Sequence, residues 1–173
     1  MEKNCCSIYY VDDCLYWYTS EALGKWFVVT LGNMLHVNLM GYAHWFMSII
    51  ISQMNDHSIS VDQARYATSI VAKYLDTVTV NTSKKCYNTT LPSDMIFTKA
   101  KKYTSAEKVQ KLTMEFNIHY RACIGSLIYL LYTRVDLSFA VHKLSKFSSN
   151  PGKQHFKGLV HLLTYLRYNK ILG

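Results

Sequence analysis

Two adjacent carboxylates, Asp12 and Asp13, follow Tyr10-Val11 near the start of the sequence. Short apolar segments at 7–9 and 14–17 flank them, which predicts a β-hairpin whose tip carries both acids. Neighbouring side chains on a strand point to opposite faces, so two adjacent acids converge only where a turn re-aims them. Two carboxylates at a tight turn can hold Mg²⁺ beside phosphates, as two-metal phosphoryl transfer requires. The alternative is a solvated Asp-Asp turn, since Asp is a favoured turn residue.

Basic and acidic residues are unevenly spread along the chain. Residues 1–98 carry six Lys and Arg against eight Asp and Glu, whereas residues 99–173 carry thirteen against three. The formal net charges of the two parts are −2 and +10, which give the +8 of the whole chain. An acidic tip in one part and a basic second part suit a polyanion that one part holds and the other acts on. Lysines scattered over solvated helix faces for solubility would give the same composition.

The composition indicates an ordered chain with neither a membrane span nor a secretion signal. Half of the 173 residues are apolar or aromatic, and there are only seven Gly and two Pro, so the chain can build one core or two small ones. The longest apolar stretches, 45–51 and 124–132, are too short or too interrupted to span a bilayer, and no signal-peptide pattern opens the chain. Five cysteines without a C-x-x-C pair favour free, mostly buried thiols in a reduced compartment. We therefore expect an intracellular protein, cytoplasmic or nuclear, with no membrane partner.

Residues 1–76 are predicted to form a mixed α and β region around the hairpin. Its further elements are a helix over 21–29, a strand over 42–52, a turn at 55–56, a strand over 58–61 and a helix over 62–75. Ser60 or Asp62 would cap the last of these helices, in which apolar residues recur at helical spacing. Trp17, Trp26 and Trp45 are expected in a core rather than as platforms for stacked bases.

Residues 77–104 are predicted to be an extended connector, and residues 105–173 a small basic helical module. The connector is rich in Thr, Ser, Asn and Lys and has no apolar periodicity. The module should contain helices over 105–116, 120–132, 136–147 and 154–168. In the third helix the expected buried stripe leaves two lysines in solvent; the stripe is Phe139, Ala140, Leu144 and Phe147, and the lysines are Lys143 and Lys146. The sequence thus predicts an α+β fold in which a mixed part precedes a helical one.

Seven segments share a pattern with one family of enzymes, in the same order and at similar spacing. They are Tyr10-Val11-Asp12-Asp13, residues 42–53, 59–66, 90–92, 120–130 and 133–136, and the stretch from Asn150-Pro151 through His155 to 163–167. The fifth segment reads Tyr-Arg-Ala-Cys-Ile-Gly-Ser-Leu-Ile-Tyr-Leu, and the sixth reads Thr-Arg-Val-Asp where the family has Thr-Arg-Pro-Asp. On these segments the chain resembles the reverse transcriptases of copia-type retrotransposons.

The resemblance implies the later half of a polymerase palm, followed by a helical thumb or connection region. It implies RNA-directed DNA synthesis, in which Asp12 binds catalytic Mg²⁺, or Mn²⁺ in its place, and Asp13 supports the site. Tyr10 and Val11 would line the site near the primer terminus and the incoming deoxynucleoside triphosphate. The RNA/DNA template–primer would be held along its backbone by Lys143, Lys146, Lys153 and Arg134. Such an enzyme would work in a cytoplasmic retroelement particle or in the nucleus.

The resemblance also limits what this chain is expected to do alone. The family places a further catalytic Asp and the nucleotide-gripping fingers upstream of the hairpin, and a ribonuclease H domain after the thumb. Only nine residues precede Tyr10, with Glu2 as their sole carboxylate, and the sequence ends at Gly173. We therefore expect a chain truncated before ribonuclease H, without its palm and finger partner segments, that is inactive as a polymerase by itself. Two other function classes stay open: a non-catalytic nucleic-acid-binding module, and a degenerate transposon relic.

Overall fold

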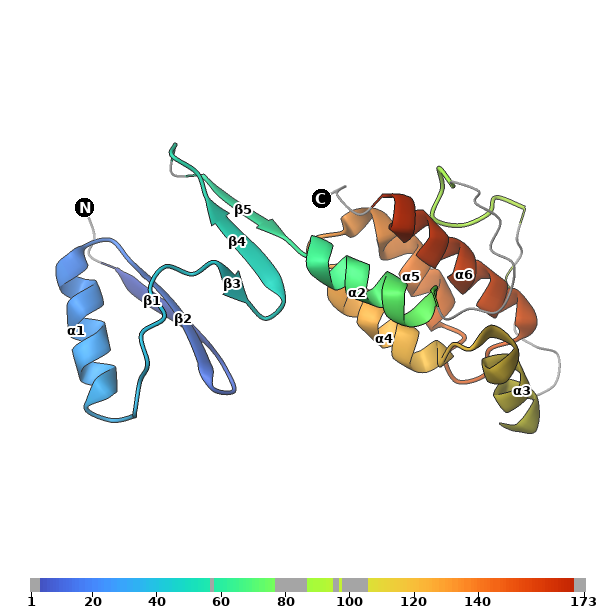
Figure 1. The fold of residues 1–173 in the computed structure, drawn as a ribbon, viewed down its shortest axis with the longest axis horizontal. Helices are drawn as coiled ribbons and strands as arrows, with labels where there is room; N and C mark the ends of the chain where they lie inside the picture. The colour runs from blue at the N-terminus through green and yellow to red at the C-terminus, as the bar shows by residue number, and fades with distance from the viewer. Residues whose placement is uncertain (1–3, 57, 77–86, 95–96, 98–105, 170–173) are drawn as a thin grey trace. The chain divides into compact units, whose positions relative to one another are not determined.

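The computed structural model describes residues 4–56, 58–76, 87–94, 97 and 106–169. The chain divides into two compact units, residues 1–61 and residues 62–173 (Figure 1). The sequence predicted the first boundary at residue 76. In the structure the helix predicted over 62–75 belongs to the second unit. Most of the predicted connector 77–104 lies outside the described residues, as does Glu2.

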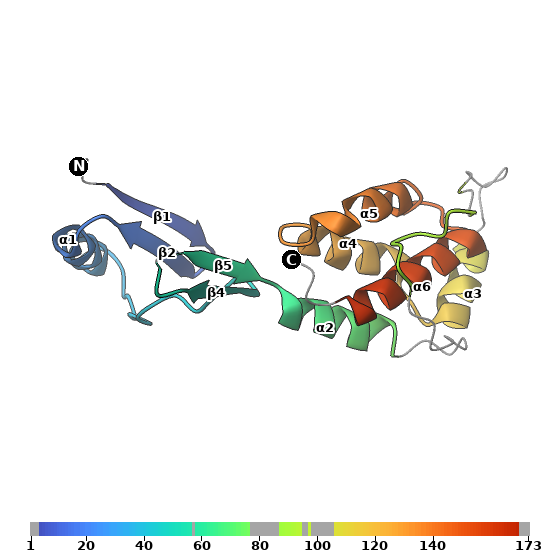
Figure 2. The ribbon, with the colours of Figure 1, turned by 90° about the horizontal axis from the view of Figure 1, so that it is seen from above.

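The first unit contains the predicted hairpin, one helix and a small sheet. Strands β1 (Cys5–Tyr10) and β2 (Asp13–Tyr18) pair antiparallel, from Cys5 opposite Tyr18 to Tyr10 opposite Asp13. Helix α1 (Glu21–Gly32) packs along this hairpin (Figures 1 and 2). Strand β4 (Ile49–Gln53) lies between β3 (Trp45–Phe46) and β5 (Ile59–Asp62) in a separate three-stranded sheet.

The strand predicted over 42–52 is in fact a second hairpin. Phe46 pairs with Ile49, so Met47 and Ser48 form a two-residue turn with φ values of +50° and +62°. Two consecutive positive φ values are typical of a type I′ turn, which matches the twist of the flanking strands. A type I′ turn favours Asn, Asp or Gly at both positions, and Met47-Ser48 has none of these, so no local signal predicts the reversal.

The second unit is a helical bundle with a continuous apolar core. Its elements are α2 (Ala64–Tyr74), α3 (Ala106–Phe116), α4 (Tyr120–Leu130), the short 3₁₀ helix η1 (Val135–Leu137), α5 (Ser138–Ser145) and α6 (Lys153–Tyr168). Helix α2 packs against α4 and α6, α5 packs against α4 and α6, and α3 contacts α6 (Figure 2). The core residues come from all of these elements and from the segment around Leu91. None of the helices among the described residues is both long and apolar enough to cross a membrane.

Local sequence explains how the bundle begins and how one loop reaches it. The Asp62 carboxylate accepts the Ala64 backbone N–H at 2.9 Å. The N-cap residue itself is Gln63, whose side chain makes no capping hydrogen bond, so Asp62 supports the start of α2 from one residue before the predicted capping position. On α6, Gly158 leaves room for the Phe97 ring, because a Cβ at this position would lie 2.7 Å from a ring carbon. The absence of a side chain at Gly158 thus allows a residue far away in the sequence to approach the helix.

Two predictions about burial are wrong. In the predicted stripe, Ala140 and Leu144 are buried as expected, but Phe139 is 68% exposed, Phe147 is only half-buried and Val141 takes the inward position. Lys143, which was predicted in solvent, is half-buried. The three tryptophans of the first unit are each more than half exposed. Of the cysteines that the structure describes, Cys123 is buried, Cys6 is exposed, and Cys5 and Cys14 are half-buried.

Candidate functional site: the acidic hairpin tip and the basic bundle

The tip of the first hairpin is a strained two-residue turn. Tyr10 and Asp13 are the last cross-strand pair, so Val11 and Asp12 form the loop between β1 and β2. Val11 has φ +52° and its side chain is 86% exposed. A positive φ at a β-branched residue is a true outlier and costs about 1–3 kcal/mol. Such strain concentrates at functional sites, and the predicted acid-bearing hairpin is confirmed as a structure.

Both acids of the tip are exposed, but they do not occupy equivalent positions. Asp13 begins β2, on the hairpin face that also carries Tyr10, Ile8, Leu15 and Trp17 by strand alternation. The opposite face carries Tyr16, whose ring lies 5.1 Å from that of Phe27 on α1. Asp13 and Tyr10 therefore lie on the face that α1 leaves open, while Asp12 lies in the turn itself.

The donor set of the tip fits Mg²⁺ or Mn²⁺ only in part. Carboxylate oxygens are the ligands these hard cations prefer, and Asp12 and Asp13 are adjacent and accessible. In the part of the chain that the structure describes, no group of three or more His, Cys, Asp or Glu side chains is placed to hold a metal ion. The two acids can supply two ligands, and substrate phosphates and water would have to complete the shell.

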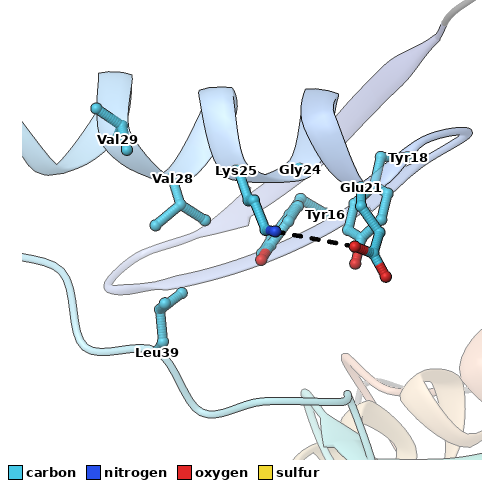
Figure 3. Close-up of a pocket in the computed structure, with 8 residues that line it drawn as sticks. All are labelled: Tyr16, Tyr18, Glu21, Gly24, Lys25, Val28, Val29 and Leu39. Carbon is cyan, nitrogen blue, oxygen red and sulfur yellow. Dashed lines mark ion pairs between the residues drawn. The ribbon is translucent and has the colours of Figure 1, made fainter.

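A shallow hollow lies on the other face of the hairpin, beside α1. It has a volume of about 390 Å³ and is lined by Tyr16, Tyr18, Glu21, Gly24, Lys25, Val28, Val29 and Leu39 (Figure 3). Glu21 and Lys25 form an ion pair of 3.9 Å at its rim. Because its β2 residues lie toward the end of the strand away from Asp13, this hollow is separate from the acidic tip.

The second unit carries most of the positive charge. Residues 62–173 contain seventeen Lys and Arg against six Asp and Glu, a formal net charge of +11, whereas residues 1–61 have a net charge of −3. The three lysines predicted to bind the nucleic-acid backbone lie on α5 (Lys143), just after it (Lys146) and at the start of α6 (Lys153). Lys143 is half-buried with its Nζ 5.3 Å from the Phe97 ring centre and 5.4 Å from that of Phe139, and Lys146 is exposed. Lys153 is exposed, and its Nζ lies 2.5 Å from Glu115 Oε1.

Arg134 has a structural role that contradicts its predicted contact with nucleic acid. Its side chain is buried, and it donates from Nε and Nη2 to the two carboxylate oxygens of Asp136, at 2.8 and 2.7 Å. Nη1 donates to the Asn169 carbonyl at 2.6 Å, and the Tyr165 hydroxyl donates to Asp136 at 3.1 Å. Arg134 therefore ties the loop before η1 to the end of α6. The sequence signal was the acid two residues later in Thr-Arg-Val-Asp, which offers a local bidentate partner.

Electrostatics of this cluster follow from its partial burial. Burial alone would raise the pKa of Asp136, but the hydrogen bonds and the charge of Arg134 outweigh it, and the pKa lies below its ordinary value. The pKa of Tyr165 is raised by burial and by the charge of Asp136. The cluster is thus an ion pair between a buried guanidinium and a partly exposed carboxylate, with further hydrogen bonds from Tyr165 and to Asn169.

Two buried histidines on α6 also have structural partners. His155 Nδ1 accepts the Gly152 backbone N–H at 2.7 Å, and its ring stacks 4.0 Å from that of Phe147. His161 Nε2 lies 2.9 Å from the Thr89 carbonyl, and burial lowers the pKa of His161. These histidines organise the start of α6 and attach the segment around Thr89 to the helix.

Comparison with known proteins finds relatives among transposon polyproteins. Over 157 residues, 91% of this chain, it is 28% identical to the Retrovirus-related Pol polyprotein from transposon RE2 of Arabidopsis thaliana. Over 47 residues, 27% of this chain, it is 47% identical to the polyprotein of the same description from transposon RE1 of that plant. The chain spans 10% and 3% of the lengths of these two relatives. The chain is similar to a region of retrotransposon Pol polyproteins.

A shorter similarity reaches a protein of a different description. Over 58 residues, 33% of this chain, it is 38% identical to the Secreted RxLR effector protein 161 of Plasmopara viticola, of which it covers 41%. Neither a protein-family model nor a solved structure matches the chain.

Proposed function

We propose that this chain is a reverse transcriptase segment of a copia-type retrotransposon Pol polyprotein. In this proposal the first unit is part of a polymerase palm, and the second unit is the thumb or connection region. The observation that carries it is the strained Val11 turn, which presents Asp12 and Asp13 at the tip of an exposed hairpin. The similarity to Pol polyproteins along 91% of the chain supports the same proposal.

Each residue of the tip has a role that its position allows. Asp12 and Asp13 would hold Mg²⁺ or Mn²⁺, which when bound stabilises negative charge during phosphoryl transfer. Tyr10 shares the open face with Asp13, where it would contact the primer terminus or the incoming deoxynucleoside triphosphate. Val11 projects from the turn beside them.

The basic bundle would hold the template–primer through its phosphates. Lys146 and Lys153 are exposed, and Lys143 is half-buried with its ammonium over the Phe97 and Phe139 rings. Contacts of this kind give affinity without sequence specificity, and that affinity falls steeply with salt. Arg134 does not belong to this surface, because its guanidinium already donates hydrogen bonds to Asp136 and to the Asn169 carbonyl.

Primer extension tests the catalytic part of the proposal. The purified 173-residue protein, given an RNA template, a DNA primer and either Mg²⁺ or Mn²⁺, should show no processive synthesis, because the tip supplies only two ligands. Incorporation that Asp12→Asn abolishes would contradict this expectation. If a Pol polyprotein segment supplied in trans restores synthesis, Asp12→Asn should remove it again.

A non-catalytic nucleic-acid-binding module is the second candidate, and the charge of the second unit favours it. Fluorescence anisotropy with an RNA–DNA hybrid, measured from 50 to 200 mM salt, tests the nucleic-acid binding that both candidates require. Replacing Lys143 and Lys146 by Gln should weaken binding and reduce the salt slope by about 2. Lys25→Gln, in the first unit, is the matched control. A salt-independent affinity would argue against both candidates, and a chain without a cooperative melt would point to a degenerate relic.

A further inference from the structure

A second hollow lies within the helical unit, and none of the residues that line it belongs to the acidic tip. Its volume is about 490 Å³, and it is lined by Tyr87, Pro92, Glu115, Phe116, Lys153, Lys157, Val160 and His161. These residues come from α3, from α6 and from the segment 87–94. A volume of this size falls within the usual range for small-molecule sites.

One wall of this hollow is a fixed aromatic surface. The Tyr87 and His161 rings lie 3.7 Å apart at an interplanar angle of 31°. His161 is 9% exposed and is held by its contact with the Thr89 carbonyl, whereas Tyr87 is only half-buried. The buried ring therefore supports the accessible one, which can accept a flat aromatic ligand on its open side.

The two lysines that line the hollow differ in their ion pairing. Lys153 is paired with Glu115, but no ion pair of Lys157 is found among the described residues. Lys157 is exposed and lies four residues before His161, so its ammonium is on the same side of α6 as the aromatic wall. The Glu115 carboxylate can accept hydrogen bonds from hydroxyl or amino groups, and Asp94 lies close enough to act electrostatically on His161.

We propose that this hollow binds a nucleoside monophosphate group, with the base stacked on Tyr87 and the phosphate on Lys157. Pro92, Phe116 and Val160 would make apolar contacts with the ligand, and the Glu115 carboxylate would accept hydrogen bonds from the sugar hydroxyls. The proposed function places duplex backbone contacts on Lys143, Lys146 and Lys153, and of these Lys153 also lines the hollow. Tyr87 and Lys157, which carry this proposal, do not belong to that surface. The site also does not depend on metal binding at Asp12 and Asp13.

Calorimetric titration of the full chain with AMP, adenosine and inorganic phosphate tests the proposal. AMP should bind more tightly than adenosine, and phosphate alone should bind weakest. Tyr87→Ala should weaken AMP binding about 5- to 100-fold, as expected for a lost base–aromatic stack, and Tyr87→Phe should retain it. Lys157→Gln should weaken AMP about 3- to 10-fold and leave adenosine unchanged. Arg121→Gln on α4 removes the same charge elsewhere and should change neither affinity.

A single-stranded oligonucleotide distinguishes the two sources of this chemistry. If the site takes one nucleotide of a strand, (dA)₁₀ should compete with AMP and lose affinity with Tyr87→Ala. If the site takes free nucleotides, (dA)₁₀ should not compete. AMP binding that is insensitive to both Tyr87→Ala and Lys157→Gln, or phosphate binding as tight as AMP binding, would overturn the proposal. A melting curve for each variant identifies loss of fold, and Lys157→Gln, an exposed change, keeps the test valid if Tyr87→Ala unfolds.

Discussion

The two units of this chain differ most in where they place their apolar side chains. All 24 buried hydrophobic residues that the structure describes lie in residues 62–173, and none lies in residues 1–61. Of the 23 large hydrophobic side chains described as exposed, 17 belong to the first unit. Apolar burial stabilises a fold by about 25 cal/mol per Å², so the second unit contains the source of stability and the first unit lacks one. The acidic tip thus lies on the less stable part of the molecule.

Core truncation should have the largest effect, and only in the second unit. Phe156 is fully buried, and its ring lies 5.2 Å from both Phe116 and Tyr120. Phe156→Ala should lower the free energy of unfolding by about 3–5 kcal/mol. Trp26→Ala in the exposed part of α1 should lower it by less than ~1 kcal/mol. Urea denaturation followed by circular dichroism measures both, and equal losses would contradict the comparison.

Breaking the Arg134 cluster should come second. Arg134→Ala leaves the partly buried Asp136 without its bidentate partner, and we expect a loss of about 2–3 kcal/mol. Arg134→Lys should not restore it, because an ammonium cannot make both carboxylate contacts and the Asn169 contact. The exposed pair of Lys153 with Glu115 provides the control, and Glu115→Gln should cost less than ~1 kcal/mol. A Glu115 effect as large as that of Arg134 would show that burial does not set the difference.

Acid should destabilise the second unit before its carboxylates titrate. The pKa of His161 is lowered by burial in the folded state. In the unfolded chain, His161 has its ordinary pKa of about 6.5, so below that pH the unfolded chain binds more protons than the folded one. The free energy of unfolding therefore falls as the pH decreases from about 6.5 toward the lower pKa of the folded state. His161→Gln should reduce the fall of the urea midpoint between pH 7.5 and pH 5.5, whereas His142→Gln at an exposed position of α5 should not. An unchanged pH dependence in the His161 variant would remove this residue as the cause.

The smallest effect should be seen at the tip itself. Val11→Gly removes the cost of a positive φ at a β-branched residue and adds backbone entropy to the unfolded chain, so the net gain should be at most ~1 kcal/mol. Hydrogen exchange of the Tyr10 and Asp13 amides reports the hairpin locally, and slower exchange is expected. Val28→Gly, inside α1, should instead speed exchange in that helix. Faster exchange at the tip of the Val11 variant would show that Val11 is not strained.

Local patterns in the sequence were sufficient where neighbouring residues decide the structure. Tyr10-Val11-Asp12-Asp13 between two short apolar segments predicted the first hairpin, and helical spacing with caps predicted the helices of the bundle to within a few residues. The second hairpin was missed because Met47-Ser48 is not a recognised turn pair. Phe139 was placed inward because the sequence shows that a face is apolar, but not which side of it meets α4 and α6.

By itself, the sequence determined the acid-bearing hairpin, the positive second part and the order of the helices, since each follows from residues close together in the chain. Only the tertiary structure decided that α2 belongs with the basic bundle, that Arg134 is buried and bonded to Asp136 and Asn169, and that Tyr87 stacks on His161. It also decided that the tryptophans of the first unit stay exposed. The physical reason is that burial and ion pairing depend on contacts between residues far apart in sequence, whose free energy no local pattern records.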